Sequence, residues 1–157
     1  MILEHTFGII TQPKDEWQDI HDDLKSPFAL LLNHTLILAL IPAICWYIGT
    51  TQVGWSVGDG EPVRLTTESA LTLAVLFYVG ILAGVVILGA IINWMARTYG
   101  AESTLAKGIA VATYTATPLF LAGIFGLYPL VWFDFIVGLV AMAASAYLLV
   151  SGVPIMM

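Results

Sequence analysis

Charged residues are scarce in this sequence. They make up 10% of the 157 residues, whereas hydrophobic residues make up 59% and the mean hydropathy is +0.92. A soluble domain contains about 25% charged residues, so the five basic and eleven acidic side chains here are too few to cover a water-exposed surface. The apolar excess therefore predicts an integral membrane protein.

Cysteine, basic charge and catalytic motifs are also missing or rare. Cys45 is the single cysteine, which excludes a scaffold held by internal disulfides. Five Lys or Arg residues and a net charge of −6 disfavour nucleic acid as a partner. There is no zinc-protease HExxH motif, nucleophile elbow or phosphate-binding loop, and His34 is the only histidine within an apolar run. We therefore expect no enzyme activity, no metal and no cofactor.

Long apolar runs are what the sequence has in abundance. Four of them reach the roughly 20 residues that cross a bilayer, at residues 28–48, 70–95, 109–127 and 131–153. Backbone groups in lipid must pair within their own segment, so each run is predicted to be a helix. The predicted fold class is all-α, with an N-terminal segment at 1–27 and an integral membrane bundle of four transmembrane helices at 28–157.

The N-terminal segment carries its own apolar stripe. Trp17, Ile20 and Leu24 lie at helical spacing among charged residues, and Pro13 suits the first position of a helix. This pattern predicts a short amphipathic helix before the first span. Its stripe either packs on the ends of the spans, lies in the membrane interface, or binds a partner.

The basic residues predict the orientation in the membrane. With four spans, Lys14, Lys25, Arg97 and Lys107 fall on one side, and Arg64 alone falls on the other. Cytoplasmic loops carry the excess of Lys and Arg. We therefore expect the N-terminus to face the cytoplasm.

Polar residues inside the spans are the first candidates for a site. They gather in the first and third spans: Asn33, His34, Thr113, Tyr114, Thr115 and Thr117, with Pro118 as a helix break. One interpretation is hydrogen bonding between helices beside a kink. The other is a polar pocket or solute path between the two spans.

Small residues at a spacing of four are the second candidate. Gly80 and Gly84 in the second span, and Ala141 and Ser145 in the fourth, allow helix backbones to approach closely. These faces serve either packing within the bundle or contact with another subunit.

The third candidate is the glycine-rich loop predicted at residues 49–60, which includes Gly49, Gln52, Trp55 and Asp59. Glycine and Asp favour tight turns there. The loop forms either an ordered cap on the bundle or a docking surface for a partner.

Several motifs together resemble the bacterial YohC-like branch of the Yip family. They are IGTTQVGW at 48–55, AVLFY at 74–78, WMAR at 94–97, ATPLFL at 116–121 and LYPLVW at 127–132. The resemblance covers essentially the whole chain and implies a multi-pass bacterial inner-membrane protein with a cytoplasmic N-terminus. Members of the family usually have five spans, so it also implies either a shorter variant or a further span beyond residue 157.

Two functions follow as hypotheses. The first is a non-enzymatic organising or accessory subunit, whose partners are the lipid bilayer and either other membrane proteins or further copies of itself. The alternative is a small-solute or ion transporter or channel that uses the polar groups of the first and third spans, since transporter sites often lie at interrupted helices.

Overall fold

The structure is a computed structural model that describes residues 2–22, 29, 34–56 and 60–157. The described residues form helices and no named strand. Four of the helical segments are long and apolar enough to cross a membrane: Leu36–Val53, Thr67–Thr98, Leu105–Leu127 and Val131–Met156. The predicted all-α bundle of four spans is confirmed, although most of residues 28–33, where the first span was expected to begin, lie outside the described residues.

The first span consists of three consecutive helical pieces. These are α4 (Leu36–Leu38), α5 (Leu40–Ile48) and η2 (Gly49–Val53), the last of which is a π-helix. Pro42 has no N–H to donate to the carbonyl of Leu38, four residues earlier, and Leu38 is the last residue of α4.

The first span also continues further than the sequence suggested. The prediction that Gly49 and Gln52 lie in a loop is wrong, because both belong to η2. The Thr50 hydroxyl donates to the Trp46 carbonyl and the Thr51 hydroxyl to the Tyr47 carbonyl, each at 2.8 Å. These bonds satisfy carbonyls at the end of the helix, and the span ends at Gly54, whose φ is +92°.

The other three spans are one long helix, one interrupted helix and a second long helix. The second span is α6 (Thr67–Thr98). The third contains α7 (Leu105–Thr115), α8 (Thr117–Ala122) and the 3-10 helix η3 (Gly123–Leu127), with its break at Ala116, two residues before Pro118. The fourth is α9 (Val131–Met156).

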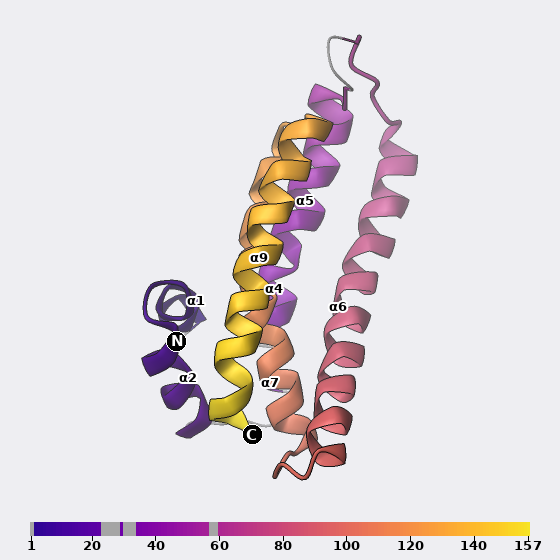
Figure 1. Cartoon of the computed structure of the whole chain (residues 1–157). Helices are drawn as coiled ribbons and strands as arrows, with labels where there is room; N and C mark the ends of the chain where they lie inside the picture. Colours follow the sequence, from indigo (N-terminus) through magenta and orange to yellow (C-terminus); the bar gives the residue numbers. More distant parts are fainter. Residues whose placement is uncertain (1, 23–28, 30–33, 57–59) are drawn as a thin grey trace.

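The helices pack unevenly around the third span. α6 packs mainly on α7 and less on α5, whereas α9 packs on α7 and α8, and α5 packs on η3. Figure 1 shows α6 at the right-hand edge of the bundle, set apart from α9. The fourth span therefore leaves much of α6 without a protein neighbour.

Two short helices precede the spans, where the sequence predicted one. They are α1 (Ile2–Thr11), which was not expected, and α2 (Pro13–Asp22). Figure 1 shows both beside the lower half of α9. Trp17 and Ile20 of α2 are buried, so these two residues of the stripe pack on the bundle; Leu24 lies outside the described residues.

Candidate functional site

The polar residues of the first and third spans meet in the interior of the bundle. The Nε2 atom of His34 lies 3.1 Å from the Oγ1 atom of Thr117, and the hydroxyls of Thr35 and Thr113 are also 3.1 Å apart. All four residues are buried. These two hydrogen bonds join residues about eighty positions apart, and we call the four residues the polar cluster.

Aromatic rings cover the polar cluster on the side of the N-terminal helices. The Tyr114 ring lies 4.6 Å from the His34 ring, centre to centre, and 6.2 Å from the Trp17 ring, which it meets edge to face. Trp17 in turn lies against α9, where a Cβ at Gly152 would come within 2.5 Å of the Trp17 ring. Tyr114 and Trp17 therefore connect the polar cluster to α2 and, through Gly152, to α9.

The remaining residues expected near the polar cluster take different positions. The Thr115 hydroxyl is buried and has no hydrogen-bond partner among the described residues. Pro118 lies in the first turn of α8, and Asn33 lies outside the described residues.

The small residues of the second and fourth spans behave differently from each other. Ala141 and Ser145 are buried along α9. A Cβ at Gly80 or at Gly84, however, would meet nothing within 4 Å. The structure therefore does not show this glycine pair packed within the bundle. That the pair contacts another subunit stays a prediction.

The close approach of helices in the second span occurs at another glycine. A Cβ at Gly89 would lie 2.8 Å from the Cα of Ile109, and a Cβ at Gly108 would collide with the Gly89 carbonyl oxygen. α6 and α7 thus meet at a pair of glycines near the turn between them.

The loop after the first span is tied to the end of the bundle. Trp55 and Val63 exchange two backbone hydrogen bonds of 3.0 and 2.9 Å, and the Ser56 N–H donates to the Pro129 carbonyl at 3.4 Å. Trp55 remains exposed, whereas Asp59 lies outside the described residues. The described part of the loop has the form of an ordered cap.

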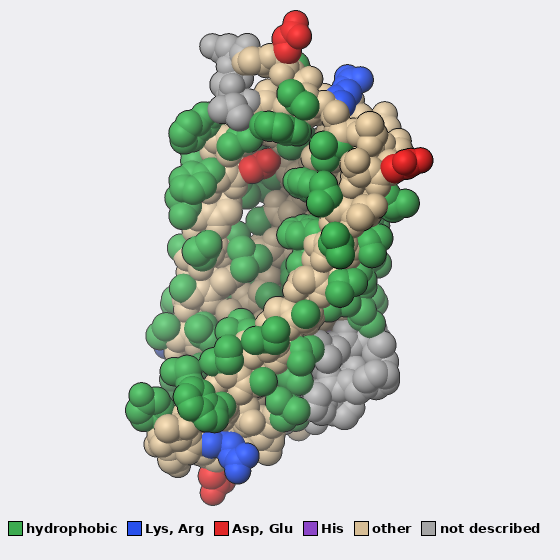
Figure 2. All heavy atoms as spheres, turned by 90° about the vertical axis from the view of Figure 1, so that its right-hand side faces the viewer, with side chains coloured by type: hydrophobic (Ala, Val, Ile, Leu, Met, Phe, Trp, Pro, Cys, Tyr) green, Lys and Arg blue, Asp and Glu red, His purple; other side chains and the backbone are tan. Residues whose placement is uncertain are grey.

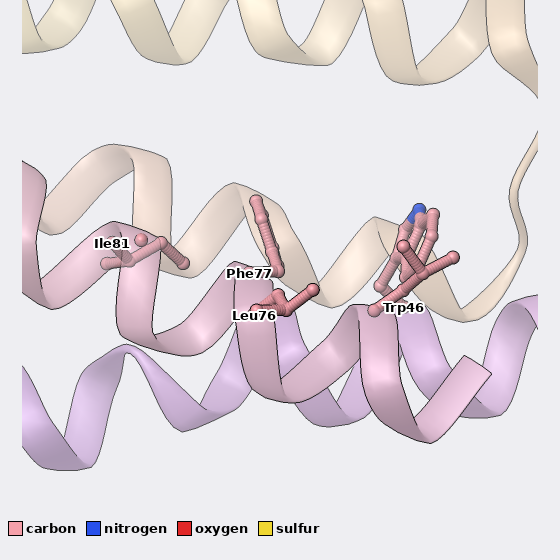
Figure 3. A pocket seen from close by; sticks show the side chains of 6 residues that line it. Trp46, Leu76, Phe77 and Ile81 are labelled. Carbon is pink, nitrogen blue, oxygen red and sulfur yellow. The ribbon is translucent and has the colours of Figure 1, made fainter. Parts of the chain in front are cut away.

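A cleft opens sideways where α6 and α9 separate, and we call it the lateral cleft. It consists of two adjoining pockets of about 740 and 270 Å³, both lined by Trp46 and Phe77. Figure 2 shows this face hollowed between the helices, with hydrophobic side chains over its middle and most charged ones near its ends. Figure 3 shows the Trp46 and Phe77 side chains projecting into the larger pocket.

The two pockets differ in their lining. The larger one is formed by Trp46 of α5 and by five residues of α6: Leu73, Leu76, Phe77, Gly80 and Ile81. The smaller one continues between α5, α8, η3 and α9, and Asp134 is the only charged residue that lines it among those the structure describes. The lateral cleft is therefore apolar along most of its length and acidic at one end.

Sequence reasoning missed the lateral cleft. Trp46 stands near the end of an apolar run, where tryptophan typically anchors a span at the membrane interface. Its proximity to Phe77, with ring centres 6.3 Å apart, depends on the tilt of α6 relative to α5. The signal that the sequence offered was the Gly80–Gly84 pair, whose lack of a protein neighbour only the structure shows. Asp134 lies near the start of the fourth apolar run, but nothing in the local sequence indicates that it faces a cleft.

Metal-ligating side chains are dispersed over the part of the chain that the structure describes. No three His, Cys, Asp or Glu residues there converge in a way that would hold a metal ion. The candidate sites in the described part of the chain are accordingly the polar cluster and the lateral cleft.

Comparison with known proteins gives a consistent picture over nearly the whole chain. The model of the family described as "Yip1 domain" matches residues 7–157. Two curated relatives, both called inner membrane protein YohC, come from Escherichia coli K12 and from Escherichia coli O6:H1 strain CFT073. Each is 45% identical over 152 residues, which cover 97% of this chain and 78% of the relative. No solved structure matches the chain.

Proposed function

The chain belongs to the Yip1 domain family, and on that premise we propose that it is a non-enzymatic accessory protein that binds transmembrane helices of other membrane proteins. It is a multi-pass inner membrane protein of the YohC type. We also propose that its N-terminus faces the cytoplasm, because four of its five basic residues belong to that side.

The observation that carries the proposal is the lateral cleft. It is apolar, open along the side of a membrane-spanning bundle, and bordered by Gly80. Gly84 follows one turn later, and neither glycine has a neighbour at the position of a Cβ. Helices in lipid associate where small residues let their backbones approach, so this surface suits another helix better than it suits a substrate.

The polar cluster supports a structural role more than transport. His34 and Thr117 bind each other, as do Thr35 and Thr113, so these groups satisfy one another in the bundle interior. Interhelical bonds of this kind hold transmembrane helices together. We therefore place the accessory role ahead of the transporter alternative.

Site-specific photo-cross-linking in native membranes tests the proposal. A photoreactive residue at Leu76, which lines the larger pocket, is expected to form adducts with a membrane protein, identified by mass spectrometry. The matched control is the same residue at Val140, which is exposed on α9 and lines neither pocket of the lateral cleft.

A blocking variant decides whether such an adduct depends on the lateral cleft. Gly80→Leu fills the space next to α6 without meeting a protein neighbour at its Cβ, so the bundle is expected to remain folded. The adduct from Leu76 should disappear in this variant. Adducts with lipid alone, or protein adducts that survive the substitution, would contradict the proposal.

A further inference from the structure

One charged side chain faces the lateral cleft, and it restricts what the cleft can bind. Asp134 is the fourth residue of α9, about 5 Å along the helix from its start by the rise per residue. It is partly buried and lines the smaller pocket together with Trp46 and Phe77. Among the described residues, no basic side chain forms an ion pair with its carboxylate.

An occupant of the lateral cleft would remove water and headgroups from this carboxylate. A carboxylate that loses its solvation without gaining a partner is strongly unfavourable. The other side chains of the smaller pocket are apolar or glycine, and none supplies a cation. A helix that fills the cleft and carries its own positive charge would compensate for this loss, and one that carries a negative charge would add to it.

The spans of this chain do not offer such a charge. Within the described spans the basic residues are Arg97, in the last turn of α6, and Lys107, near the start of α7. Both lie at the turn between α6 and α7, whereas Asp134 lies at the opposite end, where α6 and α9 begin. A second copy in the same orientation would place these two residues far from Asp134. Arg64, in the loop before α6, is the basic residue at the Asp134 end, but it lies outside the spans and its Nε donates to the Val53 carbonyl at 3.4 Å.

We infer that the lateral cleft binds a transmembrane helix of a different protein that carries a lysine or arginine at the level of Asp134. This inference rests on the proposed function and adds the chemistry of the partner. The apolar residues of α6 and the open Gly80–Gly84 edge accept the body of the helix, and Asp134 selects for its charge. Charge pairing gives specificity and register where apolar contact gives little.

Model helices test the inference directly. The full chain is placed in phosphatidylcholine vesicles with labelled synthetic helices of about 20 Leu and Ala residues. Three versions carry Lys, Leu or Glu one turn from one end, and binding is measured by energy transfer. The Lys helix is expected to bind about fivefold more tightly than the Leu helix, and the Glu helix more weakly than either.

Variants of the protein assign the preference to Asp134. Asp134→Asn is expected to abolish the preference for the Lys helix, and Asp134→Lys to shift it to the Glu helix. Glu68→Gln is the matched control, because Glu68 is an exposed acid in the first turn of α6 that lines neither pocket of the lateral cleft. A preference that survives Asp134→Asn, or that Glu68→Gln removes equally, would overturn the inference.

The cross-linking assay separates the failure of this inference from that of the proposed function. If Leu76 still forms its protein adduct in Asp134→Asn at undiminished yield, the lateral cleft binds a helix without using the charge, and only the inference fails. If Leu76 reacts with lipid alone or with a second copy of the chain, the proposed partner protein is absent and both fail.

Discussion

His34 is the residue at which the first span, the third span and the N-terminal helices come together. Its imidazole bonds to Thr117 and lies against Tyr114, whose ring also touches Trp17. An intramembrane histidine usually indicates function. On these contacts we propose a structural task for it, which is to fix the first span against the interrupted third span.

Removal of the hydroxyl that His34 contacts tests that task. Thr117→Val is expected to lower the free energy of unfolding by about 1 kcal/mol, because interhelical hydrogen bonds in membranes contribute about that much. The measurement is unfolding in mixed detergent micelles. The control is Thr72→Val, whose hydroxyl bonds only to the Glu68 carbonyl in its own helix. Equal losses in both variants would contradict the structural role of the cluster.

At the scale of helices, Gly84 and Gly89 of the second span differ in whether a neighbouring helix packs against them. Gly89 of α6 lies against Ile109, and Gly108 of α7 lies against the Gly89 carbonyl, so the two helices are in backbone contact near their turn. Gly84, five residues before Gly89, has open space around it. The sequence alone does not distinguish these positions, because the difference arises from the angle at which α6 leaves α7.

Paired alanine substitutions separate the two kinds of glycine. Gly108→Ala places a Cβ against the Gly89 carbonyl and Asn93, and we expect it to destabilise the protein by about 1–3 kcal/mol. Gly84→Ala, which meets nothing, is expected to cause no loss, since alanine favours the helix. Thermal unfolding in detergent provides the measurement. A larger loss for Gly84→Ala would show that α6 packs differently.

The docking of α2 on α9 is a second relation between helices. Trp17 is fully buried and fits against Gly152, where the absence of a Cβ leaves room for its ring. The apolar stripe of this short helix is thus used within the molecule at Trp17 and Ile20.

Loss of the Trp17 ring is therefore expected to release the N-terminal helices. In Trp17→Ala, hydrogen exchange of the α2 amides should accelerate by about tenfold or more, because the largest buried contact of the segment is lost. Trp94→Ala is the control, since Trp94 is 67% exposed. Unchanged exchange in α2 after Trp17→Ala would show that other contacts hold the segment.

At the scale of the whole molecule, charge and hydrophobic surface are separated along the bundle. Hydrophobic side chains cover the middle of the face seen in Figure 2, and the most prominent Lys and Arg side chains lie near its ends. This distribution suits a protein that contacts lipid around most of its circumference. The lateral cleft interrupts that surface on one side, so contacts with other proteins are expected there.

Cysteine accessibility tests the proposed orientation. In a Cys45→Ala background, Glu61→Cys is expected to react with a membrane-impermeant maleimide in intact spheroplasts, and Glu102→Cys only after lysis. Both glutamates are exposed in loops, at opposite ends of α6, and the positive-inside rule assigns the Glu102 loop to the cytoplasm. The reverse pattern of labelling would contradict a cytoplasmic N-terminus.

The sequence by itself determined the class of the fold and the number of spans. Scarce charge and four long apolar runs leave no other solution, because backbone groups in lipid must bond within helices. The turn preferences of single residues predicted the ends of the spans less well. Gly49 and Gln52 read as loop residues, yet the hydroxyls of Thr50 and Thr51 extend the helix past them.

Only the tertiary structure decided which residues face one another. Hydropathy places His34 and Thr117 in spans but carries no information on their rotation, which the packing of α5 on α8 and η3 sets. The same holds for Gly80 and Asp134. They become parts of one cleft because α6 packs mainly on α7, whereas α9 packs on both α7 and α8. Side-chain periodicity fixes a face of one helix, whereas a site between helices depends on angles that arise from all of their contacts.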